Sequence, residues 1–217
     1  MRYRFLPLFV ALLATMLVYP ALRGPGGSAF AANLLITVMC AAGARTILGD
    51  PKRNPLSLLV VAPPALGVWL GYFSPGDPAH GMVVLVHAGS IVFHVHILVV
   101  ALRSVYREPK ITADGVFAAM CGYVLLGVAF GHVYSIVEVV APGSFKMDDS
   151  LTRGDEHLAL TYFSFITLAT VGYGDVLPAS RTARSLAVVE ALLGQCYIAV
   201  LVADLIGKRL SQSEPDA

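Results

Sequence analysis

The sequence predicts an all-α membrane protein with six transmembrane helices and one shorter apolar segment between the fifth and the sixth. Composition is the first observation, because 57% of the 217 residues are hydrophobic and 13% are charged, whereas soluble domains carry about 25% charged residues. Apolar length is the second, since about twenty such residues form a helix that crosses a bilayer core. The net charge of +1 does not indicate a nucleic-acid partner.

Six segments have the required length, and turn or charge signals separate them. The third has Pro63 and Pro64 at its centre and is expected to kink there. The fifth starts at Thr112, a residue suited to the N-cap position. The expected spans are Phe5–Leu22, Ser28–Leu48, Leu56–Tyr72, His80–Tyr106, Thr112–Val140 and Arg181–Leu210.

The first segment has an alternative interpretation as a cleaved signal peptide, because it follows two arginines and Ala29-Phe30-Ala31 offers a small-x-small site. The charge pattern argues against it. By the positive-inside rule, both termini are expected to be cytoplasmic in a multi-pass cell membrane protein, plasma or inner. Ten of the fifteen basic residues fit this orientation: Arg2, Arg4, Arg45, Lys52, Arg53, Arg103, Arg107, Lys110, Lys208 and Arg209, against Arg23, Lys146, Arg153, Arg181 and Arg184.

The short segment Leu158–Ala169 is apolar but cannot span, which favours a re-entrant helix. Asp155 and Glu156 would lie in its first turn, where carboxylates suit the positive end of the helix dipole; a solvated outer loop is an equally compatible interpretation. The segment leads into Thr170-Val171-Gly172-Tyr173-Gly174-Asp175. Because glycine adopts positive φ cheaply, this run can turn consecutive carbonyls to one side, as replacement of a cation's hydration shell requires. A glycine-rich surface turn is the alternative.

These residues resemble the filter signature of the potassium channel family, TVGYG followed by Asp, and the resemblance extends from about Gly154 to Leu210. It implies four subunits around one axis, K+ as the permeant ion and no cofactor. Since the chain carries one copy of the motif, a homotetramer is expected. The resemblance assigns K+ coordination to oxygens of Thr170, Val171, Gly172 and Tyr173.

The same resemblance assigns support of the filter to Gly174, Asp175, Tyr162 and Phe163, with the two aromatic rings bracing Tyr173. Asp175 would bond behind the filter. Its alternative role is a cap at the start of the last helix.

In the last helix, Gly194 matches the family's hinge position, although close helix packing explains a glycine there equally well. With Gln195, three apolar residues share one helical face and are expected to form an inner constriction that gates by dewetting. These residues are Ile198, Val202 and Ile206.

Two acids accompany this helix. Glu190 either pairs behind the filter or is protonated, and Asp204 is either hydrated or paired with Lys208 four residues later.

The fourth helix carries no Lys or Arg from His80 to Leu102, so a membrane field has almost no charge to act on. It carries histidines instead. His87, His94 and, near the short helix, His157 are candidates for pH sensing, with neutral hydrogen-bonded imidazoles as the alternative. His87 and His94 are about 10 Å apart along the helix axis, too far for one metal ion.

The sequence therefore predicts a four-helix peripheral membrane domain at 1–107, a pore domain at 108–210 and a short tail at 211–217, without a soluble ligand-binding domain. The short link at 107–111 predicts that the peripheral helices pack beside the pore helices of their own chain. The expected function is passive K+ conduction in a lipid bilayer with weak or absent voltage gating, and no enzyme activity. The alternatives are a histidine-dependent transporter or metal-handling membrane protein, and a non-conducting regulatory subunit.

Overall fold

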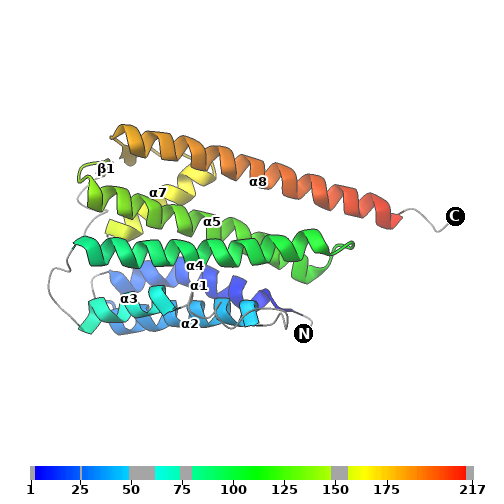
Figure 1. The fold of residues 1–217 in the computed structure, drawn as a ribbon, viewed down its shortest axis with the longest axis horizontal. Coiled ribbons are helices and arrows are strands. Elements are labelled where there is room, and N and C mark those ends of the chain that lie inside the picture. The colour runs from blue at the N-terminus through cyan, green and yellow to red at the C-terminus, as the bar shows by residue number, and fades with distance from the viewer. Residues whose placement is uncertain (1–2, 25, 49–61, 74–79, 148–155, 214–217) are drawn as a thin grey trace.

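The computed structural model describes residues 3–24, 26–48, 62–73, 80–147 and 156–213. Its architecture is a bundle of long helices with a small two-stranded sheet at one end (Figure 1). The elements are α1 (Leu6–Arg23), α2 (Ala29–Leu48), α3 (Ala62–Phe73), α4 (His80–Arg107), α5 (Ala113–Val140), β1 (Phe145–Met147), α7 (Glu156–Leu168), β2 (Val176–Pro178) and α8 (Arg181–Ser213).

Five helices of the described residues, α1, α2, α4, α5 and α8, are long and apolar enough to cross a membrane. The predicted count of six is not confirmed. The part of the third predicted span that the structure describes is helical and forms α3, Ala62–Phe73. Pro63 and Pro64 lie next to the residues outside the description, so the expected kink at these prolines stays a prediction. The expected start of that span, at 56–61, lies outside the described residues.

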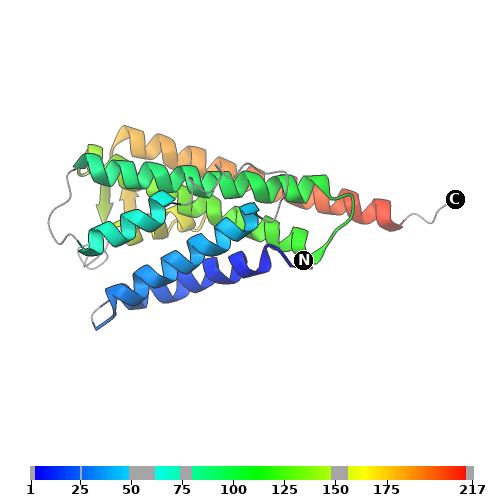
Figure 2. The same cartoon turned by 60° about the horizontal axis from the view of Figure 1, so that its bottom comes forward.

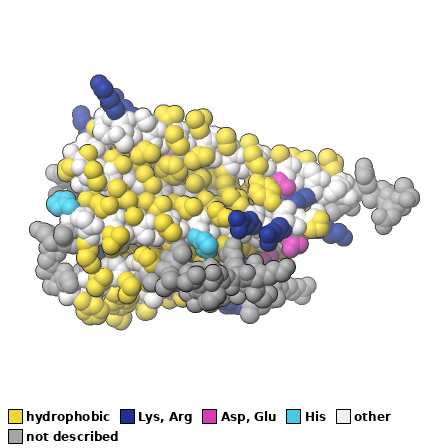
Figure 3. Space-filling model, in the orientation of Figure 1, with side chains coloured by type: hydrophobic (Ala, Val, Ile, Leu, Met, Phe, Trp, Pro, Cys, Tyr) yellow, Lys and Arg dark blue, Asp and Glu magenta, His cyan; other side chains and the backbone are white. Residues whose placement is uncertain are grey.

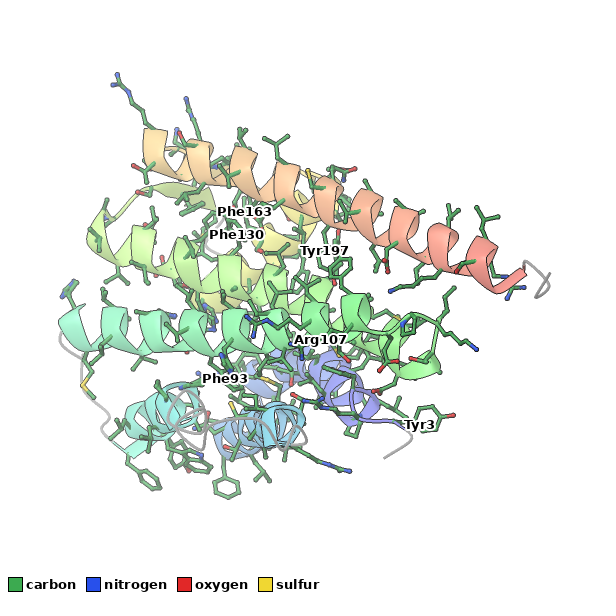
Figure 4. All side chains as sticks on the ribbon, turned by 45° about the vertical axis from the view of Figure 1, so that its right-hand side comes forward. Tyr3, Phe93, Arg107, Phe130, Phe163 and Tyr197 are labelled. Atoms are coloured by element: carbon green, nitrogen blue, oxygen red, sulfur yellow. The ribbon has the colours of Figure 1, made fainter. Side chains whose placement is uncertain are left out.

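α4 and α5 form the middle of the bundle, with α1, α2 and α3 on one side and α8 on the other (Figures 1 and 2). The main apolar core lies between α1, α2, α4 and α5. Phe93 of α4 is fully buried and points toward the α1–α2 side (Figure 4). As the short link predicts, α4 packs along α5 of the same chain.

Polar contacts fix the ends and the neighbours of these helices. Thr112 caps α5, because its hydroxyl accepts a hydrogen bond from the Gly115 amide at 3.0 Å. The backbone amide of Phe5 donates to Asp114 Oδ1 at 2.8 Å, which anchors the start of α1 to the first turn of α5. Trp69 of α3 donates to Thr37 of α2 at 2.9 Å.

The small sheet joins the exit of α5 to the segment before α8. β1 and β2 pair antiparallel, with Lys146 opposite Leu177. The Glu138 carboxylate accepts from the amides of Gly143 at 2.6 Å and Phe145 at 2.9 Å, which shapes the turn between α5 and β1. The sheet therefore ties the segment that follows the TVGYGD loop to the exit of α5.

The surface is that of a membrane protein. Hydrophobic side chains cover much of the face in Figure 3, and Lys and Arg lie at its upper left and in its right half. α1 begins and α8 ends toward the same end of the bundle (Figure 1).

Candidate functional site

The loop after α7 alternates in backbone conformation. φ is 56° at Thr170, 57° at Gly172 and 83° at Gly174, whereas Val171 and Tyr173 lie outside the positive-φ region. Alternation between residues of positive and negative φ turns successive carbonyls toward the same side. Positive φ is uncommon for a β-branched residue such as threonine, so contacts from neighbouring residues must hold the loop.

Those contacts come from α7. The amides of Val171 and Gly172 both donate to the Ile166 carbonyl, at 2.8 and 3.2 Å, and the Thr170 amide donates to the Thr167 carbonyl at 3.0 Å. Because these amides point toward α7, the opposite side of the loop can present carbonyl oxygens.

Asp175 lies behind the loop. The Tyr162 hydroxyl donates to Asp175 Oδ2 at 2.7 Å, and the Val176 amide donates to Oδ1 at 3.1 Å. Ser180, not Asp175, caps α8, because its hydroxyl accepts from the Ala183 amide at 3.1 Å. The alternative role of Asp175 as a helix cap is therefore wrong.

The structure separates the two aromatic residues expected to brace Tyr173. Tyr162 reaches Asp175, whereas Phe163 is buried against Tyr134 and Phe145, with ring centroids 5.1 and 5.4 Å away. Among the described residues, no ring contact joins Phe163 to Tyr173, whose side chain is 73% exposed. The cluster around Phe163 lies between α5, α7 and α8 (Figure 4) and supports α7, not the Tyr173 ring of the same chain.

Glu190 of α8 is fully buried behind the loop. Its carboxyl group contacts the hydroxyls of Tyr134 on α5 and Ser164 on α7. Ser164 also donates to the Gly127 carbonyl at 2.6 Å. One carboxyl group thus joins the three helices around the loop, and sequence reasoning identified neither hydroxyl partner.

Gly194 lies where α8 meets the end of α7. A Cβ at this position would lie 2.6 Å from the Leu168 carbonyl oxygen, so close packing explains this glycine directly. α8 continues as a helix through it.

The three residues of the expected constriction lie on an open face of α8. Ile198, Val202 and Ile206 are 43%, 47% and 55% exposed. Asp204 is paired with Lys208 at 2.7 Å, as the spacing predicts, and Lys208 also donates to the Val105 carbonyl of α4 at 2.7 Å.

The histidines converge. His87 of α4 and His157 of α7 meet His132 of α5, and their ring centroids lie 4.4 to 5.2 Å apart. His94 lies beside His132 at 5.2 Å. His132 was missed by sequence reasoning; the signal that could have identified it is an ionisable residue within a predicted span, which is costly to bury without a role.

The first turn of α7 contains Glu156, close to this cluster in sequence. Partial burial raises the pKa of the Glu156 carboxyl, and the negative charge of Glu138 raises it further. Asp155, the other acid expected there, lies outside the described residues.

Comparison with known proteins matches the region that holds this site. The family model described as Ion channel matches residues 120–210, from within α5 through the loop to α8. Protein LctB of Geobacillus stearothermophilus is 31% identical over 102 residues, which are 46% of this chain and 75% of that protein. Protein LctB of Bacillus caldotenax is 30% identical over 125 residues, which are 56% of this chain and 88% of that protein.

No solved structure matches the chain. The family match covers α7, the TVGYGD loop and α8, and the two relatives are covered over most of their own length. This chain belongs to the ion channel family.

Proposed function

We propose that the chain is one subunit of a homotetrameric channel that conducts K+ passively and selectively. The observation that carries the proposal is the loop at 170–175, in which positive φ recurs at every second residue. The loop's amides are bonded back to α7, which leaves carbonyl oxygens of Thr170, Val171, Gly172 and Tyr173 to replace the hydration shell of the ion.

Four copies are needed because one loop surrounds an ion on one side only. In the single chain, Val171 is 50% and Tyr173 is 73% exposed. In α8, only 11% of the most apolar 18-residue stretch is buried, compared with 44% of the equivalent stretch in α5. These open faces support assembly of four chains around the loop, with the rest of α8 facing lipid or a neighbouring chain.

In this proposal α7 is a re-entrant pore helix. Its 13 residues are too few to span, and the loop's irregular backbone is acceptable at membrane depth only inside an assembly. The negative end of its dipole then faces the cavity below Thr170 and stabilises a cation there. Both termini are placed on the cytoplasmic side, which agrees with the common direction of the start of α1 and the end of α8.

The test is rubidium flux from proteoliposomes that contain only this chain. We expect flux that barium blocks and that exceeds sodium flux. Sodium passing as readily as rubidium would contradict K+ selectivity. Zinc-dependent uptake without rubidium flux would favour the transporter alternative, and no flux from correctly assembled protein would favour a regulatory subunit.

Two glycines with the same backbone angle provide a matched comparison. Gly174 and Gly143 both have φ of 83°, and an added Cβ meets nothing within 4 Å at either position. Gly174→Ala and Gly143→Ala therefore impose the same local strain, about 1 to 2 kcal/mol. Only Gly174→Ala should abolish rubidium flux, because only Gly174 lies in the filter. Equal flux from the two variants would contradict the assignment of this loop as the filter.

A further inference from the structure

We propose that His87, His132 and His157 form a binding site for a divalent transition-metal ion of the zinc class. The site would join α4, α5 and the start of α7. It is separate from the loop at 170–175, and it does not depend on K+ conduction.

The three imidazoles are close enough to share one ion. Each histidine offers one ring nitrogen, and these three nitrogens all lie within 4.8 Å of one another. Zinc–nitrogen bonds of 2.0 to 2.1 Å in a tetrahedral site place ligand nitrogens about 3.3 Å apart. The Nδ1 atoms of His87 and His132 are already 2.9 Å apart, so side-chain rotation that closes the widest separation by at most about 1.5 Å completes the set.

A hydrogen-bond chain supports His157. The Ser135 hydroxyl donates to the Gly131 carbonyl at 3.0 Å and lies 2.8 Å from His157 Nδ1. With its one proton on the carbonyl, the hydroxyl accepts from His157 Nδ1, and the lone pair of His157 is then on Nε2. A ring N–H held in this way is the usual support of a metal-bound histidine.

A cavity gives access to the cluster. Its volume is about 460 Å³, and its lining includes the three histidines, His94 and Thr161. Thr161 Oγ1 and His94 Nε2 are buried without a hydrogen-bond partner among the described residues. His94 Nδ1 donates to the Ser90 carbonyl at 2.7 Å, so its Nε2 also carries a lone pair. An ion held by three imidazoles thus has an access path, and the same cavity offers further polar atoms.

The ligand set selects the class of ion. Imidazole nitrogen suits zinc, copper and nickel, whereas Mg²⁺ and Ca²⁺ prefer oxygen ligands, and the three clustered residues supply nitrogen only. Three neutral histidines with an open fourth position form a zinc set that also occurs in enzymes.

The position of the site gives it a mechanical consequence. His157 is the second residue of α7, and the other end of α7 holds the loop through Ile166 and Thr167. A bound ion would fasten the start of this helix to α4 and α5. If the chain conducts as proposed, zinc should therefore change rubidium flux through His132 and not through the loop.

Equilibrium dialysis of the purified, chelator-treated full chain against Zn²⁺ alone tests the site. We expect about one zinc per chain, and at least a tenfold loss of affinity in His132→Ala and in His157→Ala. Ser135→Ala should weaken binding by about 10- to 100-fold, since it removes the support of His157. His80→Ala is the matched control, because His80 is exposed on the same helix as His87, and it should bind zinc as the unchanged chain does.

X-ray absorption at the zinc edge, and the visible spectrum of the Co²⁺-loaded chain, test the site without any variant. We expect a four-coordinate ion with three nitrogen ligands. Substoichiometric zinc, six-coordinate oxygen ligation, or equal affinity in His132→Ala and His80→Ala would each overturn the proposal, whether or not the protein conducts K+. The histidines would then be a hydrogen-bonded network only.

Discussion

At the level of single residues, Glu190 is the buried group that holds hydrogen-bond partners on two neighbouring helices, α5 and α7, behind the loop. Its carboxyl group meets Tyr134 and Ser164 in a fully buried position, while Ser164 also donates to the Gly127 carbonyl. A hydroxyl has one proton, so Ser164 cannot donate to Glu190 and Gly127 together. If the group at position 190 donates a hydrogen of its own to Ser164, then Ser164 can donate to the Gly127 carbonyl and Tyr134 can donate to position 190.

Glu190→Ala should lower the free energy of unfolding by about 2 to 4 kcal/mol, because it leaves the Tyr134 hydroxyl unpaired and opens a cavity. Glu190→Gln keeps the volume and supplies an N–H toward Ser164, so it should cost less than about 1 kcal/mol. Denaturation of the detergent-solubilised protein measures both.

The control for this pair is Asp204→Ala. Asp204 is only partly buried and pairs with Lys208, so its loss should cost at most about 1 kcal/mol. A Gln variant as unstable as the Ala variant would show that a negative carboxylate, not hydrogen-bond geometry, is required at position 190.

At the level of elements, the contact between α8 and α7 decides between the two interpretations of Gly194. Gly194→Ala should destabilise the protein by about 1 to 3 kcal/mol, because the new Cβ would lie 2.6 Å from the Leu168 carbonyl oxygen and must push the two helices apart. A role as a flexible hinge alone predicts the opposite sign, since alanine favours a helix over glycine by about 1 kcal/mol.

Gly207 provides the control on the same helix. An added Cβ there meets nothing within 4 Å, so Gly207→Ala should raise stability by up to about 1 kcal/mol. Thermal unfolding of the two variants, side by side, gives the comparison. If Gly194→Ala also gains stability, packing against α7 is not what requires the glycine.

The exposed face of α8 carries the residues of the expected gate, Val202 and Ile206 among them. Val202→Asp or Ile206→Asp should raise the open probability, because a carboxylate hydrates an apolar constriction that gates by dewetting. Bilayer recordings measure it. Val200 lies on the opposite side of the helix, so Val200→Asp should leave the open probability of inserted channels unchanged. An open probability that stays the same in Val202→Asp and Ile206→Asp would place the gate elsewhere.

At the level of the whole molecule, the peripheral helices offer no voltage sensor in α4. Its basic residues, Arg103 and Arg107, lie in its last turns, and none precedes them from His80 onward. Each charge moved through 100 mV supplies about 2.3 kcal/mol, so a helix without charge in the field gains almost nothing. We expect conductance in symmetric K+ to vary little with voltage, and a steep dependence in such recordings would contradict this.

We expect the chain to assemble as a homotetramer. The chain has a mass of 23.0 kDa, and native mass spectrometry of the purified protein should give about four times that value. The physical reason is that the exposed loop needs carbonyls from several copies to surround one ion. A monomer that still conducts would contradict the proposed architecture.

Helix positions and the loop were largely predictable from sequence because they depend on local signals. The Thr112 cap and the apolar run behind it locate α5 to within a residue, and glycine spacing anticipates the positive φ at Gly172 and Gly174.

Contacts between distant segments could not be read in this way. His132 meets His87 and His157 only because α4, α5 and α7 pack together, and no spacing along the chain encodes that meeting. The pairing of β1 with β2 likewise depends on three-residue strands, which are too short to leave an alternating pattern.

The hydrogen bond from Lys208 to the Val105 carbonyl couples the last turns of α8 to the end of α4. An outward swing of the last turns of α8 must either break this bond or pull the end of α4 along with it. A lateral pull on the end of α4 would therefore reach the last turns of α8 through the Lys208 ammonium group, as a mechanical linkage and not an electrical one.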